Sequence, residues 1–415
     1  MNFNKGIWAL GNQGMVSLGN FLTNIFLARM LVTSEYGIFA ILFGSMLLLN
    51  SIQAALVTYP FSLEVAVSKP ARLRELVGAG FALTGALLVP EIVLLVLSCA
   101  RVGQVQLALL ACAVLATWQF QETCRRGLLA QFRYKEAMLG DAVSYLGQPA
   151  AILLLWWRND LSLQNVLASM AVTSVLALIV QAWQGIIGLP LRRDLGLAFT
   201  SWVRLGRWPM LTNFIVMGQT VPMYVWLLGV LVAPRAAAAM QSIGNVVGLT
   251  HPILFSMPTM MIPATAVARS QSGKVGAWML ARKYTGRFAA ALLPCYLFLC
   301  LFPGWALTLF YGRSSSFLNL AADLRIVVVA YAILLVLQCG YAFLMAMEVP
   351  HIDLLANLVG IVTAGATFYA FFHRDPLLAA ALAMLAAVGC RAIILLSSSA
   401  WIVKSQASYE RPRQS

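Results

Sequence analysis

The stretch "GNQGMVSLGNFLTNIFLARM", residues 11–30, has the length of a membrane span but carries many polar side chains. About 20 residues of α-helix cross the hydrocarbon core of a bilayer. Gln13, Ser17, Asn20 and Asn24 recur at i, i+4, i+7 and i+11, which places them on one face of a helix. This spacing predicts a membrane helix with one polar face.

A polar face inside a membrane needs partners. An amide or hydroxyl without a partner in hydrocarbon is strongly unfavourable, so we do not expect this face to contact lipid. In one interpretation, the polar side chains hydrogen-bond a neighbouring helix and hold the bundle together. In the other, they line a hydrated path for a ligand rich in hydroxyl groups.

The whole chain has the composition of a membrane protein. Of its 415 residues, 61% are hydrophobic and 10% are charged, whereas soluble domains are about half apolar and about a quarter charged. We predict an all-α polytopic membrane protein with about twelve transmembrane helices. The predicted spans lie near residues 6–30, 36–59, 77–100, 104–123, 137–157, 162–187, 208–232, 236–262, 286–311, 321–347, 351–373 and 376–402.

The formal net charge of +14 is better explained by the orientation of the protein in the membrane than by an anionic ligand. Twenty of the 28 lysines and arginines fall on the same side of the predicted spans as the N-terminus, and seven fall on the other side. Basic residues concentrate on the cytoplasmic side of membrane proteins. Both termini are therefore predicted to be cytoplasmic, and a nucleic-acid partner is not expected.

A basic segment near the middle divides the spans six and six. Because each half has an even number of spans, both halves begin on the same side, which predicts a parallel repeat. The expected parts are an N-terminal six-helix lobe (1–190), a cytoplasmic linker (191–207), a C-terminal six-helix lobe (208–403) and a disordered tail (404–415).

A second polar face supports the repeat. Asn213, Met217, Thr220 and Tyr224 follow the first polar face at the same spacing, 200 residues later. Two such faces are typical of two lobes that share one cavity, and this favours the hydrated-path interpretation. The next span adds Gln241 and Asn245, which share one face and form a further candidate cavity wall.

The segment "NIFLARMLVTSEYGIFAIL", residues 24–42, resembles the junction of the first two spans in bacterial Wzx-type polysaccharide flippases. Their superfamily, called MOP, also contains the MATE drug exporters and the lipid II flippase. The segment "QSIGNVVGLTHPILFSMPTMMIPATA" is similar in its polar start and repeated prolines. The matched positions of the first motif are Ala28, Arg29, Leu31, Tyr36, Gly37, Phe39 and Ala40.

This resemblance implies a MATE-like fold of two lobes around a central cavity. It implies movement of an undecaprenyl-diphosphate-linked oligosaccharide to the outer leaflet of the bacterial inner membrane by alternating access. Membrane lipids, a glycan polymerase and other polysaccharide assembly proteins are the implied partners. Arg29 would correspond to a cavity cation that holds diphosphate or acidic sugars. From spacing alone, Arg29 points away from Asn20, and snorkelling to the interface is the alternative.

Charged residues inside spans are further candidates. Glu91 is predicted either to couple transport to an ion, to pair with an arginine, or to stay neutral and hydrogen-bonded. Arg391 is predicted either to hold an anionic ligand or to pair with a carboxylate of a neighbouring helix, and we favour the pair. Asp141 is expected near the interface, paired with Arg133 or Lys135.

Other functional classes are disfavoured. The predicted loops are too short for an enzyme domain, and the sequence has no phosphate loop, nucleophile elbow or HExxH motif. The seven cysteines lack zinc or CxxC spacing, so neither a metal nor a cofactor is expected. A MATE-like cation or drug antiporter is the main alternative, but the predicted seventh and eighth spans contain no acid. A non-transporting scaffold is the third hypothesis.

Overall fold

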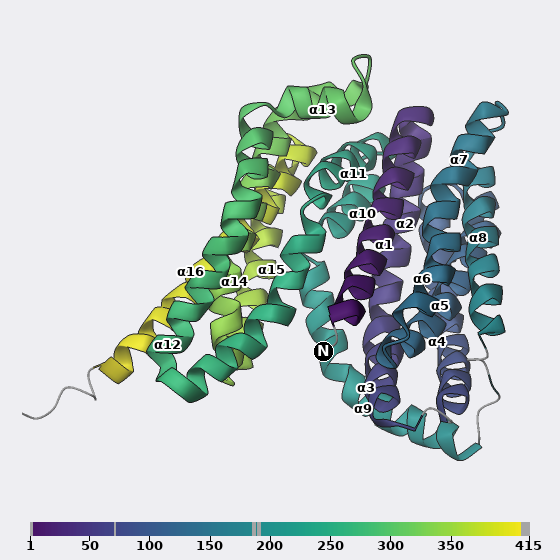
Figure 1. Ribbon diagram of the computed structural model, residues 1–415. Helices are drawn as coiled ribbons and strands as arrows, with labels where there is room; N and C mark the ends of the chain where they lie inside the picture. The colour runs from purple at the N-terminus through teal and green to yellow at the C-terminus, as the bar shows by residue number, and fades with distance from the viewer. Residues whose placement is uncertain (1–2, 70–71, 185–187, 189–191, 408–415) are drawn as a thin grey trace, which may run out of the picture. The chain divides into compact units, whose positions relative to one another are not determined.

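The computed structural model describes residues 3–69, 72–184, 188 and 192–407 (Figure 1). These residues form helices and connections without a β-strand, which confirms the all-α prediction. Nine of the described helices are long and apolar enough to cross a membrane. A tenth span is present if Phe199–Met217 and Val221–Leu231, which meet at 62°, are counted together. A polytopic membrane protein is therefore confirmed.

The difference from twelve predicted spans has two local origins. Helix α1 (Phe3–Met30) is not among the nine, and its polar residues explain the low hydropathy. Helix α12 (His251–Leu301) consists of two helical arms that meet at a kink at Gly273, counts once among the nine and contains parts of two predicted spans. Each arm has more than 20 residues, about the length that crosses the hydrocarbon core of a bilayer.

The chain forms two compact units. The first consists of Met1–Met217 and Val225–Gln241, and the second of Gly218–Tyr224 and Ser242–Ser415. The predicted linker is helical from Arg192 onward, as part of α9 (Arg192–Met217). The division into two six-span lobes stays a prediction.

The first unit is built from long helices with two π-helical turns, η1 and η4. Helices α10 (Val221–Leu231) and α11 (Pro234–Gly248) have residues in both units. The other elements of the first unit, besides α1 and α9, are α2 (Thr33–Gln53), η1 (Ala54–Thr58), α3 (Tyr59–Val67), α4 (Leu73–Arg101), η3 (Val105–Leu107), α5 (Ala108–Ala130), α6 (Tyr134–Asp141), η4 (Ala142–Leu146), α7 (Gly147–Trp157) and α8 (Leu163–Trp183).

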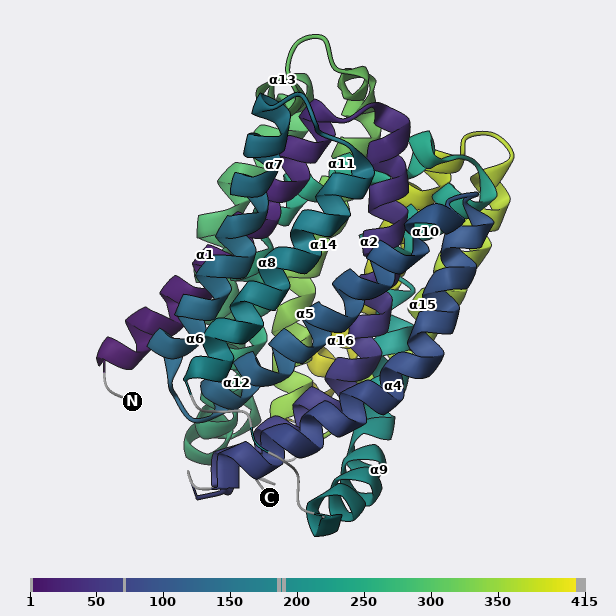
Figure 2. The same ribbon diagram turned by 90° about the vertical axis from the view of Figure 1, so that its right-hand side faces the viewer.

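Helix α1 packs along α6, η4 and α7 (Figure 2). The contact is close because Gly19 has no side chain, and a Cβ atom there would overlap the carbonyl oxygen of Tyr145. Helix α5 lies against both α4 and α8. Residue Phe61 of α3 packs edge-on to Trp202 of α9, and the Trp202 indole N–H donates to Glu64 Oε2 at 2.8 Å. Phe61 and Trp202 belong to a buried hydrophobic cluster of the first unit to which α4 and α5 also contribute.

The second unit surrounds α14 (Ala321–Ala346), which contacts α12, α15 (Pro350–Phe372) and α16 (Pro376–Ala407) (Figure 1). Two shorter elements, α13 (Pro303–Tyr311) and η5 (Ser316–Leu320), connect α12 to α14. Helix α16 begins at Pro376, and Asp375 Oδ1 caps it by accepting the backbone N–H groups of Leu377 and Leu378.

The region 269–285, expected to be a cytoplasmic loop, is helical and changes direction at one residue. Gly273 has φ 68° and ψ −168°, a conformation that is essentially restricted to glycine. The predicted span 286–311 is also interrupted, because α12 ends at Leu301 and α13 begins at Pro303. The turn at Gly273 thus falls within the loop that hydropathy predicted, whereas the break before Pro303 falls inside a predicted span.

Candidate functional site

The polar face of α1 differs in exposure along its length. Gln13 is exposed, Ser17 and Asn20 are half-buried, and Asn24 is buried. The Asn24 side-chain amide donates to the backbone oxygen of Asn20 at 2.9 Å. Gln241 Nε2 of α11 lies 3.5 Å from Asn24 Oδ1 and donates to it. The structure therefore brings two predicted cavity residues, Asn24 and Gln241, together within the first unit.

Different residues of α1 form its contact with α6 and α7. Asn12 and Thr23 are buried on the side of α1 that faces these helices. Gly19 forms the close contact with Tyr145. The polar seam between α1 and its neighbours thus uses a face other than the predicted stripe.

Arg29 is in the last turn of α1, and its side chain is exposed. It lies nine residues after Asn20, which corresponds to about half a turn of difference around a helix. The assignment of Arg29 to a ligand stays a prediction.

The second predicted stripe does not form one straight helical face. Asn213 is on α9, Thr220 lies in the break after Met217, and Tyr224 is on α10. The 62° bend between the two helices separates Asn213 from the other two residues. Gly218 and Pro222 occupy this region, and both residue types disrupt helices.

Asn245 belongs to a hydrogen-bonded group in the second unit. Its side-chain amide donates to the Tyr311 hydroxyl at 3.5 Å, and that hydroxyl donates to the backbone oxygen of Ser242 at 2.7 Å. Gln241 and Asn245 are four residues apart on α11, so they lie on one face of that helix. Their hydrogen bonds differ, since Gln241 donates to Asn24 and Asn245 donates to Tyr311.

Glu91 is only 1% exposed and lies in a cluster of neutral polar side chains. Gln119 Nε2 of α5 donates to Glu91 Oε2 at 2.5 Å. Gln53 Nε2 of α2 donates to the backbone oxygen of Gln119 at 3.2 Å and to Thr123 Oγ1 at 3.1 Å. The Thr84 and Thr123 hydroxyls are 3.3 Å apart. Five polar side chains from three helices thus meet in the first unit, and we call them the Glu91 cluster.

Hydrogen bonding in the Glu91 cluster is incomplete. Glu91 Oε1 and Gln119 Oε1 are both buried and accept no hydrogen bond from the described residues. Within that part of the chain, no arginine or lysine lies within 4.0 Å of Glu91. An ionised carboxylate is very unfavourable in such surroundings unless a cation or a proton is bound. The arginine pair proposed from the sequence is therefore not formed by the described residues.

The sequence analysis missed the partners of Glu91. Thr84 and Glu91 are seven residues apart on α4, and Gln119 and Thr123 are four residues apart on α5. Both spacings place polar residues on one helical face. This periodic signal is present in the sequence, but it does not reveal which helices face each other.

Asp141 has a different partner from the one predicted. Its Oδ2 accepts a hydrogen bond from Arg125 Nε at 2.7 Å, and Arg125 also lies 3.2 Å from Glu122. Arg133 pairs with Glu136 instead. The reason is burial: Asp141 and Arg125 are both buried, so each needs the other as a counter-charge.

Arg391 has a carboxylate neighbour in the second unit. Its Nη2 is 3.9 Å from Asp353 Oδ1 of α15. Asn357 donates to the backbone oxygen of Asp353 at 2.8 Å, and Gln219, in the break between α9 and α10, donates to the backbone oxygen of Asn357 at 3.1 Å. This geometry favours the ion-pair interpretation of Arg391. We call these four residues the Arg391 cluster.

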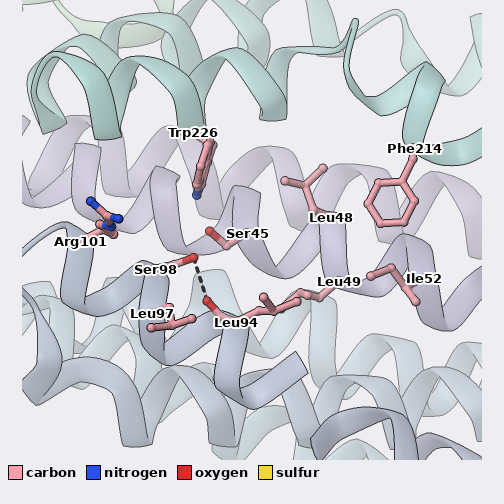
Figure 3. A pocket seen from close by; sticks show the side chains of 10 residues that line it. All are labelled: Ser45, Leu48, Leu49, Ile52, Leu94, Leu97, Ser98, Arg101, Phe214 and Trp226. Atoms are coloured by element: carbon pink, nitrogen blue, oxygen red, sulfur yellow. Dashed lines mark hydrogen bonds between the residues drawn. The ribbon is translucent and has the colours of Figure 1, made fainter. Parts of the chain in front are cut away.

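A separate pocket of about 340 Å³ lies between α2, α4, α9 and α10 of the first unit (Figure 3). None of the residues predicted from the sequence lines it. Its walls are mostly leucine and aromatic side chains, with Arg101 at one end and Phe214 at the other. Within the described residues, no group of three or more metal-ligating side chains is present, and the seven cysteines are unpaired.

Comparison with known proteins identifies the fold. No protein-family model matches the sequence, and no curated protein has a detectably similar sequence. The lipid II flippase MurJ in an inward closed conformation is similar with a TM-score of 0.71 and 11% identity, over 96% of this chain and 87% of that one. An inward-facing multidrug resistance MATE family transporter is similar with a TM-score of 0.69 and 13% identity, over 95% and 96%.

A third similar structure is a MOP superfamily transporter from Pyrococcus furiosus, with a TM-score of 0.65, 14% identity and coverage of 96% and 94%. These structures confirm a MATE-like fold over nearly the whole chain. At such low identity they do not identify a substrate.

Proposed function

We propose that this protein moves a lipid-linked oligosaccharide, carried on undecaprenyl diphosphate, from the inner to the outer leaflet of a bacterial inner membrane. It works by alternating access, with both termini in the cytoplasm. The product supplies cell-surface or exopolysaccharide synthesis, where a glycan polymerase and other assembly proteins are its partners. The fold supports the general part of this proposal, since MOP superfamily transporters, including a lipid flippase, share it.

The chemistry of the buried polar residues supports the glycan. Most buried polar side chains of the described residues are amides and hydroxyls, which are suitable partners for sugar hydroxyl groups. The buried acids are few, and two of them, Asp141 and Asp353, have an arginine within 4.0 Å. The third, Glu91, has no arginine or lysine within 4.0 Å among the described residues, so a single unpaired buried carboxylate is left for a proton or an organic cation. The polar face of α1 is the observation that carries the proposal.

Two charged residues have proposed roles in transport. Arg29 binds the diphosphate or an acidic sugar, because its guanidinium can form paired hydrogen bonds with phosphate oxygens. Glu91 binds and releases the coupling proton, because it is buried without a counter-charge within the described residues. Arg391 is proposed to stabilise the second unit through Asp353.

Reconstituted vesicles provide the test of function. The purified full-length protein is placed in vesicles with a fluorescent undecaprenyl-diphosphate oligosaccharide, and an externally added lectin reports its arrival in the outer leaflet. We expect the wild type to increase the rate, and Asn24→Leu and Arg29→Ala each to reduce it about tenfold or more. A tenfold loss corresponds to about 1.4 kcal/mol of interaction with the transported lipid.

Leu18→Ala is the matched control, since Leu18 is exposed on α1 outside the polar face. It should transport at the wild-type rate. If the protein exchanges organic cations for protons and leaves the glycan lipid in place, it is a MATE-like antiporter and the proposal is wrong. Loss of folding in Asn24→Leu, with normal transport by Arg29→Ala, would support the helix-contact interpretation of the polar face.

A further inference from the structure

The pocket in the first unit has the size and position of a binding groove. Its volume of about 340 Å³ is in the range of small-molecule sites, which is roughly 300–1,000 Å³. Ser45, Leu48 and Ile52 of α2 form one wall. Leu94 and Leu97 of α4 lie opposite them (Figure 3).

The surface beside this groove has the character of a lipid-facing surface. The α4 residues Val89, Val93 and Leu97 are each more than half exposed. Only 28% of the apolar window of α4 is buried. Large exposed apolar side chains on a span contact hydrocarbon in a bilayer. A concave part of such a surface is filled by a lipid chain, because an empty groove would lose its van der Waals contacts.

The hydroxyl groups in the groove are already used as donors. Ser45 Oγ donates to the backbone oxygen of Ile41 at 2.9 Å. Ser98 Oγ donates to the backbone oxygen of Leu94 at 3.0 Å, as the dashed line in Figure 3 shows. A sugar would therefore find few donors here, whereas a hydrocarbon chain needs none.

Arg101 gives the groove a charged end. It is the last residue of α4, its side chain is exposed, and no described carboxylate lies within 4.0 Å of it. A guanidinium at the end of a span is at the depth where phospholipid phosphates lie, and it forms charge-assisted hydrogen bonds with phosphate. The charge complements an anionic lipid whose chain extends toward Phe214 at the far end.

We propose that this groove binds one acyl chain of an anionic phospholipid, with the lipid phosphate on Arg101. The site is separate from the path of the transported glycan. It attaches a bilayer lipid to the contact between α2, α4, α9 and α10, so occupancy stabilises this part of the first unit. The preference is for a net negative headgroup, because Arg101 is the single charged side chain among the described groove residues.

Native mass spectrometry of the purified full-length protein tests this proposal. The detergent-solubilised protein is titrated with phosphatidylglycerol or with phosphatidylcholine of the same chain length. We expect the anionic lipid to be retained more strongly, and Arg101→Gln to weaken its retention about fivefold, the effect of one basic residue near a membrane surface. Leu97→Trp fills the groove and should reduce retention of both lipids.

Two matched variants control for general effects. Arg158→Gln removes another arginine that follows a span, and Val93→Trp adds an indole to the exposed surface of α4 outside the groove. Both should retain lipid as the wild type does. Equal retention of the two lipids by the wild type, or unchanged retention by Arg101→Gln, would overturn the proposal. So would displacement of phosphatidylglycerol by a polyprenyl phosphate at equal concentration, since the groove would then belong to the transported lipid. Thermal unfolding of Leu97→Trp verifies that this variant is folded.

Discussion

The Glu91 cluster of the first unit and the Arg391 cluster of the second each contain a buried carboxylate, but only the second contains a guanidinium beside it. Glu91 is surrounded by amides and hydroxyls, and two acceptor oxygens in its cluster remain without donors. Asp353 is also buried, at 7% exposure, but it lies 3.9 Å from the guanidinium of Arg391. Hydrogen bonding is incomplete there too, since Asp353 Oδ1, Asn357 Oδ1 and Arg391 Nε have no hydrogen-bond partner among the described residues. Each cluster joins three segments of the chain through polar side chains, which hydropathy alone would not place inside a membrane span.

This difference distinguishes a carboxylate that must stay ionised for the protein to fold from one that can gain and lose a proton. A carboxylate beside a guanidinium stays ionised, because losing its charge would leave the buried cation without compensation. A carboxylate among neutral groups has no such constraint, and it satisfies its surroundings when it carries a proton. We therefore expect the Arg391 cluster to affect folding and the Glu91 cluster to affect the energetics of transport.

Arg391→Leu should have the largest effect on stability. It leaves Asp353 buried without a counter-charge, and we expect a loss of about 3 kcal/mol in the free energy of unfolding. Denaturant titration of the purified protein measures this loss. The double variant with Asp353→Asn should recover part of it, and Arg374→Leu, at an exposed position, is the control. An unchanged unfolding midpoint would show that Arg391 is free to bind a ligand.

Gln53→Leu should have an intermediate effect. Its side-chain NH₂ group lies within 3.4 Å of three acceptors on α4 and α5, which its two N–H groups share, and the substitution leaves these acceptors buried without this donor. We expect a loss of about 1–3 kcal/mol, measured in the same titration. Gln164, which is exposed on α8, provides a control through Gln164→Leu. A neutral result would mean that water replaces the Gln53 amide and that the cluster is hydrated.

Glu91→Gln should have the smallest effect on stability and a specific effect on function. The new amide oxygen still accepts the hydrogen bond from Gln119, so the free energy of unfolding should change by less than about 1 kcal/mol. Transport by this variant should no longer respond to an imposed pH gradient, as measured in the vesicle assay. If Glu91→Gln destabilises the protein as much as Arg391→Leu, the contrast between the two clusters disappears.

The sequence was sufficient to predict the class of fold. Hydropathy is a local property, so the spans at α4, α8, α14, α15 and α16 could be located from single stretches. The polar face of α1 followed from helical periodicity, and the structure brings Asn24 of that face to Gln241. The resemblance at residues 24–42 led to the superfamily whose fold this chain shares.

The features that could not be predicted depend on contacts between segments that are distant in the sequence. The bend after Met217 divides a stripe that would be continuous on a straight helix, and a spacing of 200 residues carries no information about it. The partner of Asp141 is Arg125, 16 residues away, because buried charges select buried counter-charges over nearer exposed ones. Gln119 is 28 residues from Glu91, and only the packing of α4 on α5 joins them.

The kink within helix α12 has a mechanical consequence. Its two arms, 251–272 and 274–301, meet at Gly273 without a loop between them. A helix resists bending, and one glycine is then the joint at which the angle between the arms is set. A methyl group at this residue, as in Gly273→Ala, would disfavour the present angle between the arms. Because no loop absorbs the movement, a tilt of one arm would also move the other.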